Sequence, residues 1–448
     1  MKKDTINWEK VQQKATEYLC QYLRINTVNP PGNEIEGARF LKELLSQSGI
    51  PGTIVESKPG RGNLIAHLEG GGEKPPLLLL SHIDVVPAEA ENWLYPPFSG
   101  KLVDEEIWGR GALDCKSLGI TDAMVLILLK KSGTPLHRDI IMAATADEEK
   151  GGTLGASWLC QNQPVFQNIE AVINECGGVG IAGENKNYYF CQVAEKGICW
   201  MRIRFTGSPG HASLPRNDNC ILSLAKCLDR IVALKPKIQL SPLTIRFLKG
   251  FSDDDALAPV FDQIARDPRS ADTALKHIKD KGLKQLLGTM LRTTFVPTVV
   301  KGGEKTNVIP SECYCDVDCR ILPGKTPEEI KKEIEALLSD IPRFSIEMID
   351  SSTASESSQR HELYHLCEQS LRRHDPKTKM IPYISSGATD SRFFRNQGTP
   401  AFGFAPLLVD GDLSQYQDLV HGHNERISQK NLLFGIKVLY DVVREYSS

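Results

Sequence analysis

A run of four leucines, Leu77 to Leu80, constrains this chain most. An apolar run without polar alternation is typical of a strand that is buried on both faces, as in a parallel sheet. The strand is expected to end at SHID, where His82 and Asp84 would project to the same side. A carboxylate beside an imidazole can hold one ring nitrogen and leave the other for a metal or a proton. A purely structural pair is the open alternative.

Composition narrows the class of protein. The 448 residues allow two or three domains, and a formal net charge of −3 favours neither nucleic acid nor an anionic membrane as a partner. No stretch approaches the roughly 20 apolar residues of a membrane span, and the polar N-terminus does not resemble a signal peptide. The 12 cysteines are scattered and form no C-x-x-C pair, which is typical of reduced thiols. We therefore predict a cytoplasmic protein without nucleic-acid or membrane partners.

The order of predicted elements indicates an α/β protein with an insertion. Strands and helices alternate up to about Glu195, and the same pattern returns from Gln359. Between them lie strands with alternating polarity and two helices, which indicates an inserted α+β layer. We predict one domain formed by residues 1–194 and 351–448, and a second, inserted domain formed by residues 195–350. The mostly helical stretch from Pro242 to Phe295 is expected to enlarge this inserted domain.

Two local patterns belong to the predicted insertion. Thr326 precedes a helix and Glu329 follows three residues later, which predicts a capping box. The segment CYCDVDC, with Cys313, Cys315 and Cys319, superficially resembles a metal motif. Its alternation suits a strand better, with the cysteines as small apolar fillers.

Acidic residues and histidines recur where the predicted strands of the α/β part end. In open α/β sheets, binding sites gather at the carboxyl ends of the strands. Each residue alone has a structural explanation, since acidic residues after a strand often only begin a helix. Two histidines with three or four carboxylates fit a pair of zinc-like ions, and a further glutamate could transfer protons. The residues are His82, Asp84, Asp114, Asp147, Glu148, Glu149, Glu175, His421 and His423.

Seven segments in this order resemble a known family. They are SHIDVVPAEAENWLYPPFSG, GRGALDCK, ADEEKGG, INECGG, NVIP with DCR, GATDSRFF and HGHNER. Together they resemble the aminoacylase/carboxypeptidase S branch of the co-catalytic zinc metallopeptidases. That family includes succinyl-diaminopimelate desuccinylase, acetylornithine deacetylase, carnosinase and the peptidase T type. The resemblance covers nearly the whole chain. It implies a zinc-exopeptidase-like catalytic domain with a mixed, mainly parallel sheet in residues 1–194 and 351–448, and an α+β lid or dimerisation domain in residues 195–350 that the helical stretch 242–295 enlarges.

The resemblance implies a role for each residue of the constellation. Asp84 would orient His82, Asp114 would bridge two metals, and Glu148 would be the general base. Cys115 stands where the family often has Asp or Met, after a peptide bond that is typically cis. Two divalent ions are implied, with zinc first and cobalt or manganese as alternatives. The implied metal ligands are His82, Asp114, Glu149, Glu175 and His421.

The resemblance also implies residues that contact substrate. His211, in GSPGHASLP, would reach the scissile carbonyl, commonly from the partner subunit, and stabilise the oxyanion. Asn307 and Arg320 match positions that hold the substrate carboxylate, a task that suits the fork of an arginine. The loop GATDSRFF would contribute further contacts, although an arginine that opens a helix, here Arg392, is often only structural. The residues implied in this loop are Gly387, Thr389 and Asp390.

The expected reaction is amide hydrolysis. The implied substrates are N-acyl amino acids or short peptides with a free carboxylate, and the implied assembly is a homodimer through the lid. A dipeptidase, or a deacylase or desuccinylase of a biosynthetic intermediate, is the alternative within the same chemistry. Phosphodiester cleavage is a further alternative, which Asn307 and Arg320 argue against. A non-catalytic metal- or ligand-binding homologue would lack Glu148 or several ligands, and this chain retains them all.

Overall fold

A ten-stranded mixed sheet forms the centre of the main body. The computed structural model describes residues 6–409 and 411–448. The strand order is β1-β2-β6-β3-β7-β18-β9-β16, and β8 and β17 also pair with β9. The strands are β1 (Gly52–Lys58), β2 (Arg61–Leu68), β3 (Lys74–His82), β6 (Arg138–Thr145), β7 (Ala171–Asn174), β8 (Val179–Ala182), β9 (Asn187–Glu195), β16 (Ser355–Glu356), β17 (Thr378–Ser385) and β18 (Ala401–Gly403).

The leucine run lies in the middle of this sheet, as predicted. Strand β3 pairs in parallel with β6 on one side and with β7 on the other. Leu77 and Leu79 pack into one core cluster, whereas Leu78 and Leu80 pack into another. Alternate side chains of a strand point to opposite faces, so both faces of β3 are covered.

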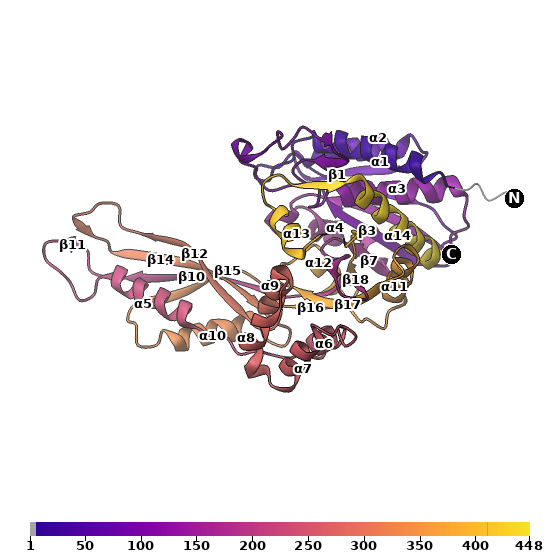
Figure 1. The fold of residues 1–448 in the computed structure, drawn as a ribbon. Helices are drawn as coiled ribbons and strands as arrows, with labels where there is room; N and C mark the ends of the chain where they lie inside the picture. The colour runs from indigo at the N-terminus through magenta and orange to yellow at the C-terminus, as the bar shows by residue number, and fades with distance from the viewer. Residues whose placement is uncertain (1–5, 410) are drawn as a thin grey trace.

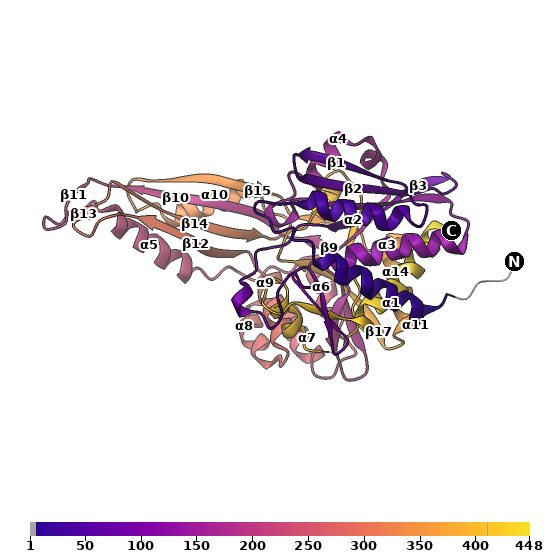
Figure 2. The ribbon, with the colours of Figure 1, turned by 90° about the horizontal axis from the view of Figure 1, so that it is seen from above.

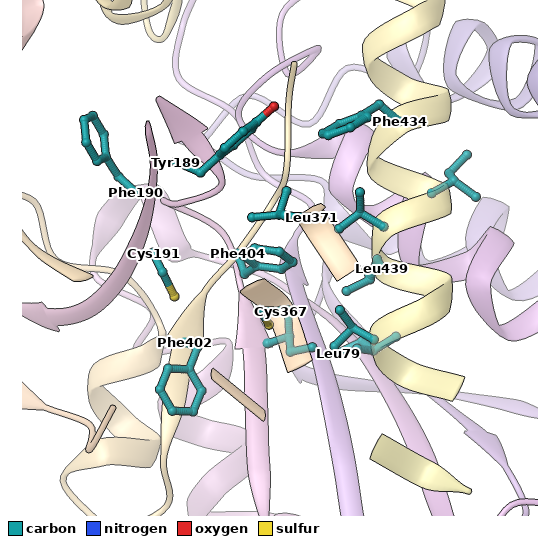
Figure 3. Close-up of a cluster of buried hydrophobic side chains, with 14 of the residues drawn as sticks. Leu79, Tyr189, Phe190, Cys191, Cys367, Leu371, Phe402, Phe404, Phe434 and Leu439 are labelled. Carbon is teal, nitrogen blue, oxygen red and sulfur yellow. The ribbon is translucent and has the colours of Figure 1, made fainter. Parts of the chain in front are cut away.

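Helices cover the two faces of the sheet (Figure 1). The larger core cluster joins β3 and β9 to α11 and α14, and Figure 3 shows Leu79, Tyr189, Leu371 and Leu439 from these four elements. Aromatic side chains such as Phe434 fill the remaining space. The body helices are α1 (Trp8–Leu23), α2 (Glu34–Ser46), α3 (Lys116–Ser132), α4 (Ala156–Asn162), α11 (Glu362–His374), α12 (Ser391–Arg395), α13 (Leu413–Leu419) and α14 (Gln429–Ser447).

A second, antiparallel sheet forms an arm that extends from the body (Figures 1 and 2). Its order is β12-β14-β10-β15, with β10 (Gly197–Thr206), β12 (Thr294–Gly302), β14 (Glu312–Ile321) and β15 (Phe344–Ser352). Helices α5 (Cys220–Ala233) and α10 (Pro327–Leu337) pack on this sheet around their own core. We call this arm the lid. The predicted fold class is therefore confirmed: an α/β body with a separate antiparallel layer.

Local predictions for the lid are also confirmed. Thr326 and Glu329 form the capping box at the start of α10. Cys313, Cys315 and Cys319 are buried on one face of β14, where they fill the lid core. The domain boundaries at 194/195 and 350/351 stay predictions.

The stretch from Pro242 to Phe295 was predicted to enlarge the lid, but its helices, which span residues 242–290, do not belong to the lid, so that prediction is wrong. It forms α6 (Pro242–Lys249), α7 (Ala258–Arg266), α8 (Ala271–Ala274) and α9 (Lys281–Met290), whose buried residues belong to the core of the body. Phe251 lies 4.6 Å from Tyr188 of β9, ring centre to ring centre, and Phe247 lies 5.5 Å from Phe190. Helix α6 packs against β9 and β17, where an aromatic surface is available. Helix α7 packs on α6, and α9 packs on α13 of the body.

Two small sheets complete the described structure. β4 (Lys101–Val103), β5 (Glu106–Trp108) and β19 (Arg426–Ser428) form a three-stranded sheet on the body. β11 (Gly210–His211) and β13 (Val308–Ile309) pair at the end of the lid that is farthest from the body (Figures 1 and 2). Within residues 6–409 and 411–448, none of the helices has both the length and the apolar character needed to span a bilayer.

Candidate metal centre

The carboxyl ends of three neighbouring strands meet at one edge of the main sheet. His82 ends β3 and pairs in register with Thr145, the last residue of β6. Glu148 and Glu149 follow β6 in a short 3-10 turn, and Glu175 follows β7 directly. The parallel pairing of these strands therefore brings residues from distant parts of the sequence to one place, as predicted.

Asp114 and His421 reach the same place from loops. His82 Nε2 lies 2.8 Å from Asp114 Oδ1 and 3.4 Å from Glu175 Oε2. His421 Nε2 lies 3.0 Å from Asp114 Oδ2 and 3.1 Å from Glu149 Oε2. One carboxylate oxygen of Asp114 thus faces each histidine.

The possible ligand atoms fall into two groups, each within 4.8 Å of one another. The first ligand group consists of His82, Asp114, Cys115 and Glu175, and the second ligand group of Asp114, Glu149 and His421. Imidazole and carboxylate ligands suit zinc, and also cobalt or manganese. Glu149 Oε1 is buried and has no hydrogen-bond partner among the described residues. An acidic cluster with a free buried oxygen needs positive charge, so the residues present fit divalent cations.

The surroundings shift the pKa values of the carboxyl groups in different directions. Burial raises the pKa of Glu175 to about 7 and that of Glu148 well above its ordinary range. Burial opposes ionisation of Asp114 as well, but hydrogen bonds with His421 and His82 outweigh it and lower its pKa. Asp114 therefore stays a carboxylate between the two imidazoles.

Both imidazoles hold their protons tightly. Hydrogen bonds with Asp114 and Glu149 raise the pKa of His421 to about 10. Burial alone would lower the pKa of His82, but the acidic groups Cys115, Glu175 and Asp114 together raise it well above its ordinary value. A metal binds the unprotonated nitrogen, so metal binding must release these protons.

Asp84 supports the site in a different way from the one expected. His82 Nδ1 lies 2.8 Å from the main-chain oxygen of Asp84 but 3.7 Å from its carboxylate. The ring is therefore held by the carbonyl, which leaves Nε2 directed at Asp114. The carboxylate instead accepts hydrogen bonds from the main-chain N–H groups of Glu148 and Glu149, with N···O distances of 3.1 and 3.2 Å. Asp84 thus joins the end of β3 to the turn that carries both glutamates.

Two residues near the site were not predicted to contribute. Asn29 donates hydrogen bonds to Asp84, at 2.9 Å, and to Asp147, at 3.1 Å. Nothing in its loop sequence indicates these partners, which are 55 and 118 residues away. Cys115 accepts the main-chain N–H of His82 at 3.2 Å, and the Asp114–Cys115 peptide bond is cis, as the resemblance implied.

His211 and Asn307 lie away from this cluster within one chain. Both are exposed at the tip of the lid, where the N–H of Ala212 donates to the carbonyl of Asn307 at 3.0 Å. Arg320 lies at the opposite end of β14, where it forms a two-pronged ion pair with Asp318. One chain therefore does not bring Asn307 and Arg320 together.

The GATD loop lies beside the cluster but is largely enclosed. Thr389 is buried and donates to Glu195 at 2.6 Å, and Asp390 is buried and accepts from Thr145 at 2.9 Å. Arg392 donates to the carbonyl of Gly151 at 2.8 Å, which fits a structural role. His423 lies 3.5 Å from Glu89 and belongs to neither ligand group.

Comparison with known proteins settles the family. The family model described as Peptidase family M20/M25/M40 matches residues 78–445, which is most of the chain. The chain belongs to this family. It is therefore a hydrolase of a metallopeptidase family, and the predicted relationship is confirmed.

Characterised relatives of this M20-family chain cover most of its length. It is 29% identical over 393 residues to human N-fatty-acyl-amino acid synthase/hydrolase PM20D1, covering 82% of this chain and 74% of the relative. It is 27% identical over 440 residues to rat aminoacylase-1A, covering 96% and 94%. The M20 family metallo-carboxypeptidase Sso-CP2 from Sulfolobus solfataricus shares the fold, with a TM-score of 0.73, 18% identity and 99% coverage of both chains.

Proposed function

We propose that this M20-family protein is a two-metal amidohydrolase that cleaves N-acyl amino acids or short peptides with a free carboxylate. One observation carries the proposal: Asp114 belongs to both ligand groups and presents a different oxygen to each histidine. A shared carboxylate between two imidazoles suits a pair of cations, and the adjacent Glu148 supplies a proton acceptor.

Each ligand group would hold one cation. His82 and Glu175 would bind the first and His421 and Glu149 the second, with Asp114 bridging them. When bound, the cations supply Lewis acidity that lowers the pKa of a water molecule and polarises the amide carbonyl. Zinc is the expected metal, with cobalt or manganese as alternatives.

Glu148 would carry the proton during the reaction. Its main-chain N–H is fixed by Asp84, and its side chain lies among the charges of Glu175, His82 and Glu149. Burial raises its pKa, so the carboxyl can keep a proton taken from the attacking water. Glu148 would then pass this proton to the departing amine.

The lid would complete the site from a second copy of the chain. His211 and Asn307 are at the tip of the lid, and the tip of the second copy could reach the metal centre in the body of the first. Two features support pairing through the lid: β12 is an edge strand, and exposed apolar side chains lie on it and on the adjacent α5. These side chains are Ile221, Leu222, Val232, Val296 and Val300.

In such a homodimer the substrate contacts would come from both chains. The imidazole of His211 would donate to the oxyanion, and Asn307 would bind the substrate carboxylate together with Arg320 of the other chain. The GATD loop, with Gly387, Thr389 and Asp390, would line the body side of the site. The names of the relatives, an aminoacylase and an N-fatty-acyl-amino acid hydrolase, support N-acyl amino acids as the substrate class.

A substrate panel tests this proposal. Release of free amino acid is measured from N-acyl amino acids of increasing chain length and from dipeptides, with added zinc, for the wild type and for Glu148→Ala. We expect the wild type to cleave the acyl series and the variant to lose activity while retaining its metal content. Cleavage of dipeptides alone would shift the substrate class, and two bound metals without any cleavage would favour a binding protein.

A further inference from the structure

A buried ion pair joins the two loops that carry the second ligand group. Arg110 Nη1 donates to Glu425 Oε2 at 2.7 Å, and the two side chains are 2% and 0% exposed. The partners are 315 residues apart in the sequence. Arg110 lies shortly before Asp114, and Glu425 shortly after His421. Each partner therefore belongs to a loop that carries one possible metal ligand.

Glu425 holds the loop of Asp114. Its Oε1 accepts the main-chain N–H groups of Leu113, at 2.6 Å, and of Asp114 itself, at 3.0 Å. Its Oε2 also accepts the N–H of Gly111 at 3.0 Å. Hydrogen bonds to an ionised acceptor are strong, so this carboxylate fixes the backbone of the bridging aspartate.

Arg110 holds the loop of His421 in return. Its Nη2 donates to the carbonyl oxygens of His421, at 3.2 Å, and Gly422, at 2.9 Å. His421 has a φ of 62°, a left-handed conformation that residues other than glycine rarely adopt, so it needs such support. The guanidinium also lies 5.2 Å from the ring centre of Trp93, which limits its movement.

We propose that Arg110 and Glu425 are positioning residues that set the distance between Asp114 and His421, and hence the affinity of the second ligand group for its metal. This inference rests on the proposed two-metal function. The first ligand group depends less on the pair, because His82 ends β3 and Glu175 directly follows β7, both in the central sheet. The pair should therefore act mainly on one of the two metals.

Metal titration of two variants tests the inference. Co²⁺ is added to metal-depleted wild type, Arg110→Lys and Glu425→Gln, and binding is followed by calorimetry and by the visible spectrum of cobalt. Arg110→Lys keeps a positive charge beside Glu425 but cannot reach both carbonyl oxygens. We expect the metal of the second ligand group to bind about 10–100-fold more weakly in each variant, and the affinity for the other metal, which shares only Asp114, to fall less.

Arg138→Lys is the matched control. Arg138 is also a buried arginine that pairs with a glutamate, Glu170, and stacks on an aromatic ring, but it begins β6, at the opposite end from the metal centre. It should bind both metals as the wild type does.

Three results would overturn the inference. The first is wild-type affinity for both metals in folded Arg110→Lys. If circular dichroism shows that Glu425→Gln does not fold, the result for Arg110→Lys alone decides. The second is an equal loss of affinity in Arg138→Lys, which would reflect general destabilisation. The third is a wild type that binds no metal, because that result would remove the proposed function itself.

Discussion

The body and the lid hold their predicted functional residues in opposite ways. In the body, His82 is buried and Asp114 is half-buried, and the two side chains contact one another directly at the edge of a buried sheet. In the lid, His211 is exposed on a two-residue strand, and within the described part of the chain its Nδ1 contacts a near neighbour in sequence, Ser213. The difference indicates that one chain organises the metal centre by itself, whereas the lid residues need a second surface.

Glu148→Ala should cause the largest loss of activity, because it removes the proposed proton carrier from the metal centre in the body. We expect kcat to fall about 10²–10⁴-fold, the usual contribution of general acid–base catalysis, with metal content unchanged. Steady-state kinetics and elemental analysis measure the two quantities. Glu69→Ala, an exposed glutamate of the body, is the control. A fall of less than tenfold would assign the proton transfer to another group.

Mixing two inactive variants tests whether the lid of one chain acts on the metal centre in the body of the other. His211→Ala should lose about 10²–10³-fold in kcat, as for the loss of one oxyanion donor. If the lid acts across a two-fold dimer, denaturing and refolding Glu148→Ala together with His211→Ala should restore about a quarter of wild-type activity, since half of the dimers gain one intact site. No recovery, in protein shown to be dimeric, would place the action of His211 within one chain.

Metal affinity should depend on pH because of the imidazoles in the body. The pKa of His421 is raised to about 10 and that of His82 lies well above its ordinary value, so both carry protons at neutral pH. A metal displaces them, and its apparent affinity should fall about tenfold per pH unit for each displaced proton as the pH is lowered from 8 to 6. Calorimetric titrations in buffers of different ionisation enthalpy count the protons. Affinity that is independent of pH would contradict this assignment.

Thr326→Ala should have the smallest effect of these substitutions, and we expect it to change only the stability of the lid. It removes the capping box of α10 and should lower the free energy of unfolding by about 1 kcal/mol. Urea unfolding measures the change, and metal affinity should stay the same because α10 packs on the lid core. Thr326→Ser, which keeps the hydroxyl, should recover most of the stability. A change in metal affinity would show that the two regions are coupled.

Burial of single strands could be predicted from the amino-acid sequence. The leucine run predicted that β3 is covered on both faces, and the alternation of CYCDVDC predicted a strand with buried cysteines. The ends of the parallel strands also indicated where His82, Glu149 and Glu175 would gather. These properties follow from periodicity and from the polarity of single strands, which are local features of the chain.

Which buried surfaces contact one another could not be predicted from the sequence and was found in the three-dimensional structure. The apolar faces of α6 to α9 can be recognised in the sequence, but their partners on the body cannot: α6 packs beside the aromatic side chains of β9, and α9 packs on α13. The Arg110–Glu425 pair and the contacts of Asn29 join segments that are far apart in sequence. A hydrophobic pattern specifies that a face is buried without specifying its partner, because burial of apolar surface is non-directional. Such pairings depend on the path of the whole chain.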